Sequence, residues 1–417
     1  MIDRPQGGER AVLVHVDFDN QDIQEDLAEF QELVISAGAI VLDVVRSTRS
    51  VPDVKFFIGS GKAQTLMQAV KAFDAEIVIV NHALSPAQAR NLEKLISCRV
   101  VDRTSLILDI FAQRARSFEG KLQVELAQLK HMSSRLIRGW THLERQGGGI
   151  GLKGPGETQL ETDRRLIKNR IKLIAARLDK VKKQRALSRR GRQKAQIPTV
   201  ALVGYTNAGK STLFNCISAA EVFAADQLFA TLDPTLRKIH IPEIGEVIVA
   251  DTVGFIRHLP PDLIDAFSAT LEEVSGAHAL LHVVDLSANN WRENMAEVDA
   301  VLAKLGADTI PQISVFNKID LCAQVDQASS SESTTFDKVW VSAQNGLGIE
   351  RLTQALTKIL AINMVEQTIM LQPEEGKLRA SLYARDAVLS ETIDEAGQFH
   401  LHVRLSANAL QKLINGK

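Results

Sequence analysis

The chain has 417 residues and a net charge of −1, and a chain of this length is expected to form about three domains of roughly 100 to 200 residues each. Its three cysteines lie far apart in the sequence, which argues against a disulfide framework and a zinc site and favours a reducing cytoplasm. No uninterrupted apolar run approaches the roughly 18 residues of a membrane-spanning helix, and residues 1–10 are polar rather than signal-like, so we expect a soluble cytoplasmic protein.

Strand and helix patterns alternate through the first part of the chain. Strands are expected at residues 11–18, 39–45, 75–80 and 99–101, and helices at 21–37, 62–73 and 85–96. This alternation predicts a parallel-sheet α/β domain over residues 1–110. Within it, Gly61 and Lys62 end a short glycine-rich stretch that is a weak candidate for a phosphate site. A turn that enters a helix is the favoured interpretation, because the longer spacing of a phosphate loop is missing.

Two long helical patterns follow, at residues 106–141 and 158–192, and a glycine-rich segment at 147–156 joins them. Apolar residues recur at helical spacing in both arms, which predicts a helical hairpin whose arms pack on each other. The expected contact residues are Leu122, Leu126, Leu129, Met132 and Leu136 in the first arm, and Leu166, Ile167, Ile171, Ile174 and Leu178 in the second. We expect this region to form a second domain, 111–196, that ends in a polar linker at 186–196.

The charge of the chain is concentrated in this hairpin. Residues 121–195 contain 20 Lys and Arg against 6 Asp and Glu, whereas the whole chain has a net charge of −1. A solvated helix face is the ordinary explanation for a charge run, but so large an excess beside a glycine-rich tip favours contact with a polyanion. Only Trp140 is available near the tip for base stacking, so folded RNA is favoured over a single strand. The expected RNA-binding residues are Arg135, Arg138, Arg145, Gly148, Gly149, Lys153, Arg164 and Arg165.

A phosphate-loop (P-loop) motif begins the third domain, which is expected at residues 197–363. Residues 204–211 read Gly-Tyr-Thr-Asn-Ala-Gly-Lys-Ser, between an expected strand at 199–203 and an expected helix at 212–217. Glycines let the backbone turn its N–H groups towards phosphate oxygens, and the helix adds its positive N-terminal end. Lys210 would then contact the outer phosphates, and the Ser211 hydroxyl would bind Mg²⁺.

Three further segments follow expected strands and favour a guanine nucleotide. The strand at 247–250 leads to Asp251 and Gly254, which can hold Mg²⁺ through water and contact a γ-phosphate. Further strands are expected at 280–284 and 313–316. The second leads to Asn317-Lys318-Ile319-Asp320, where a carboxylate can accept two hydrogen bonds from guanine but would face acceptors on adenine. A last strand at 339–341 leads to Ser342 and Ala343, which can support the base.

Residues 364–417 are expected to form a small α+β domain. Strands are predicted at 369–371 and 399–405, and helices at 378–388 and from 407 onward. His400 and His402 alternate along one of these strands. Surface histidines are commoner than ligands at such positions, so we assign them no function.

Together these motifs resemble the translation-factor-class GTPases and, more narrowly, the HflX family. The narrow resemblance rests on residues 147–157, 160–165 and 229–235, and the whole resemblance covers nearly all of the chain. It implies an N-terminal α/β domain, a helical arm, a P-loop GTPase domain and, as in some members, a small C-terminal domain. It also implies Mg²⁺-dependent hydrolysis of GTP, binding to the large ribosomal subunit and its RNA, and splitting of stalled or idle ribosomes under stress.

The resemblance also assigns functions to single residues. Thr231 would be the switch threonine that closes over Mg²⁺ beside Ser211, with Thr235 as the rival candidate. Catalysis would depend on Lys210, Thr231 and Gly254. The expected GTP-binding set is Gly204, Tyr205, Thr206, Asn207, Ala208, Gly209, Lys210, Ser211, Thr212, Phe229, Thr231, Asp251, Thr252, Val253, Gly254, Asn317, Lys318, Asp320, Ser342 and Ala343.

Phe255 stands where GTPases of the Ras type have a glutamine that orients the attacking water. Its side chain cannot orient water, so hydrolysis is expected to be slow until a partner supplies the missing groups. Two other functions stay open at this stage. One is an RNA-remodelling protein with an additional ATP site at Gly61 and Lys62, and the other is a ribosome-assembly factor that uses GTP as a timing switch. A monomer is expected away from the ribosome.

Overall fold

The computed structural model describes residues 8–18, 26–139, 155–195, 197–218, 228–229, 231–257, 268–322, 337–361, 364–383, 387–394 and 397–406. The chain forms two compact units. The first contains Met1–Lys183, Asp226–Leu232 and Arg257–Ser268, and the second contains Gln184–Ala225, Asp233–Ile256 and Ala269–Lys417. Among the described residues, no helix is long and apolar enough to cross a membrane.

The N-terminal domain has a four-stranded parallel sheet. Its strand order is β2-β1-β3-β4, with β1 at Arg10–Phe18, β2 at Ile40–Arg49, β3 at Ile77–Val80 and β4 at Arg99–Asp102. Helices cross between the strands at α1 (Leu27–Ser36), α2 (Ser60–Phe73) and α3 (Pro86–Ile96). Ser85 caps α3, since its hydroxyl accepts from the Gln88 N–H as part of a capping box. Gly61 lies in the first turn of α2, where the interpretation as a turn entering a helix places it.

The first arm of the hairpin is two helices, so the prediction of one helix over 106–141 is wrong. Helix α4 spans Arg103–Arg114, and α5 spans Phe118–Gly139. Between them Ala115 is extended, with φ −61° and ψ 112°, and the Ser117 hydroxyl accepts a hydrogen bond from the Gly120 N–H at 2.8 Å. This serine cap starts a new helix without a proline or glycine to signal the break.

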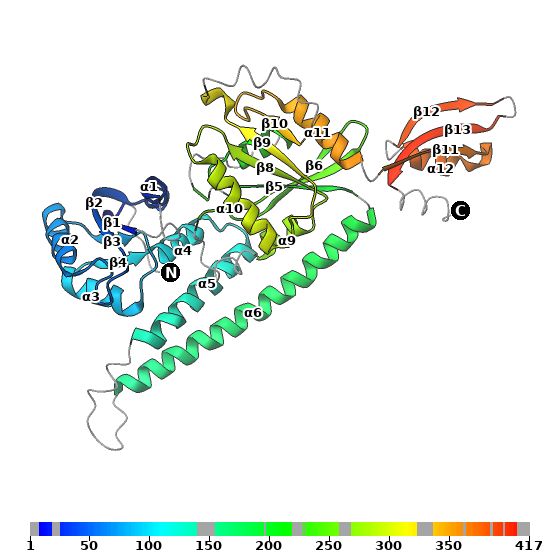
Figure 1. Ribbon diagram of the computed structural model, residues 1–417. Coiled ribbons are helices and arrows are strands. Elements are labelled where there is room, and N and C mark those ends of the chain that lie inside the picture. The colour runs from blue at the N-terminus through cyan, green and yellow to red at the C-terminus, as the bar shows by residue number, and fades with distance from the viewer. Residues whose placement is uncertain are drawn as a thin grey trace. The chain divides into compact units, whose positions relative to one another are not determined.

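The second arm is α6 (Pro155–Ala195), which packs along α5 within the first unit (Figure 1). Helix α6 continues through most of the expected linker at 186–196. The cluster between the arms contains Leu122, Leu126, Leu129, Ile174 and Leu178, as predicted.

Two expected members of that stripe face solvent. Met132 is 52% exposed because the cluster ends at Leu129, and Leu166 is 58% exposed. Leu166 lies about 100° around the helix from its neighbour Ile167, which is half-buried and begins the row that continues to Ile174 and Leu178. The side chain of Leu136 lies outside the described residues.

The GTPase-like domain is a six-stranded sheet with the order β10-β9-β8-β5-β7-β6. The strands are β5 (Thr199–Gly204), β6 (Thr235–Ile241), β7 (Gly245–Asp251), β8 (Ala279–Asp285), β9 (Gln312–Asn317) and β10 (Lys338–Trp340). All pairs are parallel except β6 with β7. The helices are α7 (Lys210–Ser218), α9 (Ser268–Ser275), α10 (Trp291–Lys304) and α11 (Ile349–Ala361), with a 3₁₀ turn, η2, at Ile319–Leu321.

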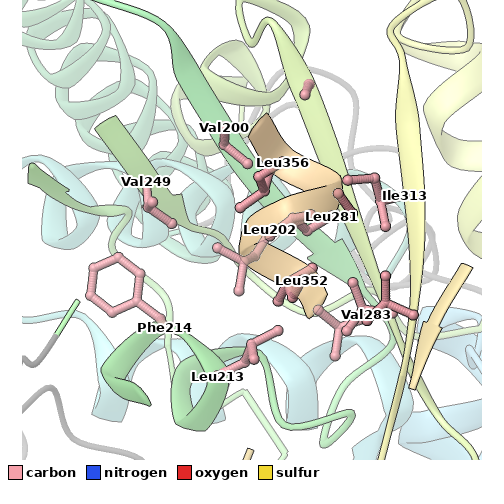
Figure 2. Close-up of a cluster of buried hydrophobic side chains, with 14 of the residues drawn as sticks. Val200, Leu202, Leu213, Phe214, Val249, Leu281, Val283, Ile313, Leu352 and Leu356 are labelled. Atoms are coloured by element: carbon pink, nitrogen blue, oxygen red, sulfur yellow. The ribbon is translucent and has the colours of Figure 1, made fainter. Parts of the chain in front are cut away.

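A buried apolar cluster joins this sheet to its helices (Figure 2). Leu202, Leu281 and Ile313 come from the central strands, while Phe214 and Leu352 come from α7 and α11. The sequence patterns predict each of these central strands but not β6. That edge strand carries Arg237 and Lys238 and has several half-buried or exposed positions, so it lacks the apolar run of a buried strand.

The C-terminal domain is a three-stranded antiparallel sheet of order β11-β13-β12, with β11 at Met364–Leu371, β12 at Val388–Ile393 and β13 at Phe399–Ser406. A short turn, η4 (Pro373–Glu375), precedes α12 (Gly376–Tyr383), and Leu382 packs with Leu401 and Val403. The predicted helix at 378–388 is too long, because Val388 already pairs with β13 as a strand. The helix expected from 407 lies outside the described residues. The predicted fold class, with an α/β domain, a helical hairpin, a P-loop domain and a small α+β domain, is confirmed.

Candidate functional site

The predicted motif segments meet at one edge of the six-stranded sheet. The P loop follows β5, Thr252–Gly254 follow β7, Lys318–Asp320 follow β9, and Ser342 and Ala343 come shortly after β10. Parallel strands place their carboxyl ends at the same edge, which is where open α/β sheets bind their ligands. The sheet order therefore brings together residues that are more than 100 positions apart in the chain.

The P loop requires glycine at two positions. Gly204 has φ 152°, and a Cβ there would collide with the Val283 carbonyl oxygen. Gly209 has φ 87°, and a Cβ there would collide with the Asn317 side-chain nitrogen. Helix α7 then begins at Lys210, so successive backbone N–H groups point out of the helix start towards the loop. This arrangement suits a bound anion, as the motif predicts.

Lys210 is buried in this loop. Its Nζ donates to the Gly204 carbonyl at 3.1 Å and to the Tyr205 carbonyl at 2.6 Å. Burial lowers the pKa of Lys210 to about 8, and the nearby Asp251 carboxylate acts in the opposite direction. The ammonium is therefore held by neutral carbonyl oxygens, which are weaker partners than phosphate oxygens would be.

Ser211 and Asp251 lie side by side. The Ser211 hydroxyl donates to Asp251 Oδ2 at 2.8 Å, and the Asp251 residue is fully buried at the end of β7. Its neighbour Thr252 donates its hydroxyl to the Leu202 carbonyl at 2.5 Å, which fixes the chain after β7. A hydroxyl and a carboxylate are the hard oxygen ligands that Mg²⁺ prefers, so the residues present fit that ion.

The segment after Asp251 lies against the P loop. The Thr206 N–H donates to the Phe255 carbonyl at 2.7 Å, and the Phe255 N–H donates to the Gly204 carbonyl at 3.1 Å. A Cβ at Gly254 would lie 2.8 Å from the backbone Cα of Thr206 and 2.9 Å from Lys210 Nζ, so the Thr206 backbone leaves room only for glycine. The Phe255 side chain is buried and has no hydrogen-bonding group.

Asn317 connects the P loop to the predicted base-binding loop. Its side-chain nitrogen donates to the Ala208 carbonyl at 2.9 Å, and its side-chain oxygen accepts from the Ala343 N–H at 3.0 Å. Asn317 therefore links the P loop to the segment that follows β10. Asp320 is exposed in η2, where its carboxylate is open to a ligand.

Asp285, which contacts this loop, was not predicted from the sequence. Lys318 has φ 63°, and its Nζ forms an ion pair with Asp285 Oδ2 at 2.7 Å. Asp285 ends β8, between the strands that carry the other motifs. Asp285 directly follows the apolar run of the predicted strand at 280–284, and this position could have identified it from the sequence.

Phe229 and Thr231 belong to the first compact unit. Phe229 is buried, and its ring packs edge-on against Phe111 of α4 with centroids 4.6 Å apart. The neighbouring Leu228 N–H donates to the Ser36 hydroxyl of α1 at 3.2 Å. Helices α1 and α4 thus hold the stretch that contains the expected switch threonine. The approach of Thr231 to Mg²⁺ stays a prediction.

The N-terminal domain also holds a second stretch of the same unit. Arg103, at the start of α4, donates to Glu29 at 2.7 Å, to Asn81 at 2.8 Å and to the Arg257 carbonyl at 3.2 Å. Arg257 comes two residues after Phe255 in the chain. Buried side chains of the first domain therefore contact backbone that directly follows the γ-phosphate segment.

The expected RNA-binding residues are only partly described. Arg135 is 27% exposed and pairs with the buried Asp102 at 2.6 Å, which gives it a partner within the fold. Arg164 is half-buried and Arg165 is exposed on α6. Of the remaining expected residues, the structure describes only the backbone of Arg138, and it does not describe Arg145, Gly148, Gly149 or Lys153.

The sheet order, the P loop, the Ser211–Asp251 pair and the Asn317 link define a P-loop GTPase. The chain is 56% identical to GTPase HflX of Escherichia coli (strain K12) over 406 residues, which cover 97% of this chain and 95% of that protein. It belongs to the HflX family of GTPases.

A second relative and three family models agree with this family. GTPase HflX of Caldanaerobacter subterraneus subsp. tengcongensis is 46% identical over 93% of this chain and 89% of its own length. Family models match in order: GTP-binding GTPase N-terminal at 24–112, GTP-binding GTPase Middle Region at 114–192, and 50S ribosome-binding GTPase at 199–318. A GTP-binding protein of Sulfolobus solfataricus, solved with GDP, is 26% identical with a TM-score of 0.45, covering 85% of this chain and 99% of that one.

Proposed function

We propose that this GTPase binds the large ribosomal subunit through its basic hairpin and, in the GTP-bound form, dissociates stalled or idle ribosomes. The observation that carries the proposal is the presence, in one chain, of a P loop bonded to Asn317, a Ser211–Asp251 pair and a hairpin with 20 Lys and Arg against 6 Asp and Glu. The family model that matches residues 199–318 describes a 50S ribosome-binding GTPase, which supports the same partner.

In the nucleotide site, backbone N–H groups of residues 207–212 hold the phosphates. Lys210 exchanges the Gly204 and Tyr205 carbonyls for outer phosphate oxygens, which are stronger partners for a buried ammonium. Ser211 and Asp251 would hold Mg²⁺, and Thr231 would join them in the GTP state. When bound, Mg²⁺ neutralises charge on the phosphates.

Asp320 selects guanine by accepting hydrogen bonds from the base. Asn317 keeps the base loop at a fixed distance from the P loop through its bond to Ala208. The Lys318–Asp285 ion pair holds the stem of the loop, while Ser342 and Ala343 support the base from the next strand. Adenine would present acceptors to the Asp320 carboxylate, so ATP should bind weakly at this site.

Contacts within the first unit can couple nucleotide binding to the position of the hairpin. Thr231 and Gly254 are the groups expected on the γ-phosphate, and the residues near them in sequence, Phe229 and Arg257, are held by α4. Helix α4 leads into α5, the first complete helix of the hairpin. GTP binding thus acts on stretches that contact the same element that carries the hairpin, and hydrolysis releases them.

Ribosome docking completes hydrolysis. Phe255 cannot orient water, and groups that a partner supplies to a GTPase are worth about 10³ to 10⁵ in rate. GTP turnover should therefore be slow for the isolated protein and rise steeply when purified large ribosomal subunits are added. The proposal of a ribosomal partner fails if turnover is equal with and without large subunits across a range of subunit concentrations.

A further inference from the structure

Thr206 in the P loop carries a buried hydroxyl. The residue is 7% exposed, and the described residues provide no hydrogen-bond partner for its Oγ1. A buried hydroxyl without a partner lowers the stability of a protein, because the group has lost its hydrogen bonds to water. Valine has nearly the same shape and would avoid this cost. The hydroxyl at this position therefore calls for a functional explanation.

The position of Thr206 indicates what the hydroxyl can contact. A Cβ built on Gly254 would lie 3.0 Å from Thr206 Cγ2 and 2.9 Å from Lys210 Nζ. The Thr206 methyl group, the Gly254 backbone and the Lys210 ammonium thus surround one point, and the Thr206 hydroxyl is on the same Cβ as that methyl group. Gly254 and Lys210 are the groups expected on the outermost phosphate, so Thr206 borders the same phosphate position.

The backbone of Thr206 is already engaged. Its N–H donates to the Phe255 carbonyl at 2.7 Å, and Phe255 in turn donates to the Gly204 carbonyl. The side-chain hydroxyl is therefore the group that Thr206 can offer to a ligand. The residue to which the Thr206 N–H is bonded, Phe255, has an apolar and buried side chain.

The chemistry of a hydroxyl matches what Phe255 lacks. A glutamine amide can accept a hydrogen bond from water and donate one to a phosphate oxygen. A threonine hydroxyl has one donor and two acceptor lone pairs, so it can do both at once. A methyl group on the same carbon restricts the rotamers of the side chain and holds the hydroxyl in place.

We propose that the Thr206 hydroxyl is a further catalytic group of this GTPase, which holds the γ-phosphate and the attacking water and so performs the function that Phe255 cannot. The inference rests on the proposed placement of GTP in the P loop. The water oxygen forms a bond to the γ-phosphorus, and the bond to the bridging oxygen breaks with its electron pair left on GDP. Both water protons leave with the phosphate as H₂PO₄⁻, so Thr206 accepts and donates hydrogen bonds without a net gain of a proton.

The test compares Thr206→Val with Thr206→Ser in the full chain. Thr206→Val keeps the shape and removes the hydroxyl, so kcat for GTP should fall about 10- to 100-fold, the size expected for one hydrogen bond to a charged group. Thr206→Ser keeps the hydroxyl and should stay within about threefold of the natural chain. The affinity for GDP, measured with a fluorescent GDP analogue, should be unchanged in both variants.

Two controls separate catalysis from folding. Thr199→Val removes a hydroxyl at the opposite end of β5 and should leave kcat unchanged. Thr206→Val should melt at the same temperature as the natural chain or higher, because it removes an unpartnered buried group. The inference is overturned if Thr206→Val keeps kcat within threefold, if Thr206→Ser loses as much as Thr206→Val, or if GDP affinity falls in parallel. Absence of GTP hydrolysis in the natural chain would instead contradict its assignment as a GTPase.

Discussion

Nucleotide binding should change both the hydrogen-bond partners and the pKa of Lys210. Its ammonium is buried, its partners are two neutral carbonyls, and burial lowers its pKa to about 8. A polyphosphate beside the ammonium favours the charged form and raises that pKa. The free and bound proteins therefore differ in how readily they hold this proton, and the difference makes nucleotide affinity depend on pH.

The direction of this pH dependence follows from the two states. Below a pH of about 8, Lys210 is charged before and after binding, so affinity should be flat. Above it, the free protein loses the proton that the complex retains, and affinity should fall by up to about tenfold per pH unit. Fluorescent-GDP titrations between pH 7 and pH 9.5 measure this. Lys210→Ala, with weak binding, provides the background slope from the base itself, and a natural chain whose slope matches that background would contradict the assignment.

At the scale of elements, α4 has the contacts that matter most. Its start holds the Arg257 carbonyl through Arg103, and its middle holds Phe229 through Phe111. These contacts join residues that are far apart in the sequence but lie within the first compact unit, and no sequence motif predicts them. Through these contacts the N-terminal domain holds Phe229 and Arg257. In the sequence, both residues lie in segments that connect strands of the GTPase sheet.

Loss of the Phe229 ring should loosen one of these stretches. In Phe229→Ala, the cavity left against Phe111 should weaken the packing by an amount typical of a buried aromatic, about 3 to 5 kcal/mol. Amide exchange at Leu228, whose N–H donates to Ser36, should become faster, while exchange in β5 should not change. Phe229→Leu is the matched variant and should show an intermediate rate. Unchanged exchange in Phe229→Ala would show that the ring does not hold this stretch.

The outer face of α6 has a separate function in this account. Arg165 is exposed there and should contact ribosomal phosphate, so Arg165→Glu should weaken binding to large subunits and reduce the salt dependence of that binding. GTP affinity should not change. Lys238→Glu on β6 makes the same change of charge away from the hairpin and is the control. Equal losses in the two variants would mean that overall charge, rather than the hairpin, sets binding.

The elements that sequence reasoning predicted well are those whose burial is visible in a short window. Strand β5 is buried at every position, so its apolar run stands out. Strand β6 was missed because Arg237 and Lys238 interrupt any such run. The break before α5 was missed because apolar residues keep helical spacing across it, and the Ser117 cap that causes it is a local hydrogen bond.

The residues of the candidate site also differ in whether a short window of sequence reveals them. Gly204, Lys210 and Asp320 were predicted because their chemistry depends on neighbours in the same motif. The Lys318–Asp285 pair and the buried hydroxyl of Thr206 depend on strands far apart in the chain, so they required coordinates. Contact between the basic residues of the second arm and RNA likewise depends on a complex with RNA, which the sequence of one chain does not describe.

At the scale of the whole molecule, GTP is proposed to control an RNA-binding hairpin on the same chain. The proposed GTP site contains the Asn317–Ala208 and Ser211–Asp251 hydrogen bonds, and the hairpin carries the large positive excess. Phe255 leaves the site without a side chain that orients water, so the cycle is expected to wait for the ribosome. In this account, GTP binding supplies the energy for docking, and hydrolysis allows release.

The most direct test is to incubate intact ribosomes with the protein and a non-hydrolysable GTP analogue and to separate the products on a sucrose gradient. The account predicts that intact ribosomes decrease and free subunits increase, with the protein on the large subunit. Arg165→Glu should reduce this shift, and GDP in place of the analogue should largely abolish it. Binding to intact ribosomes without any increase in free subunits would contradict ribosome splitting as the function.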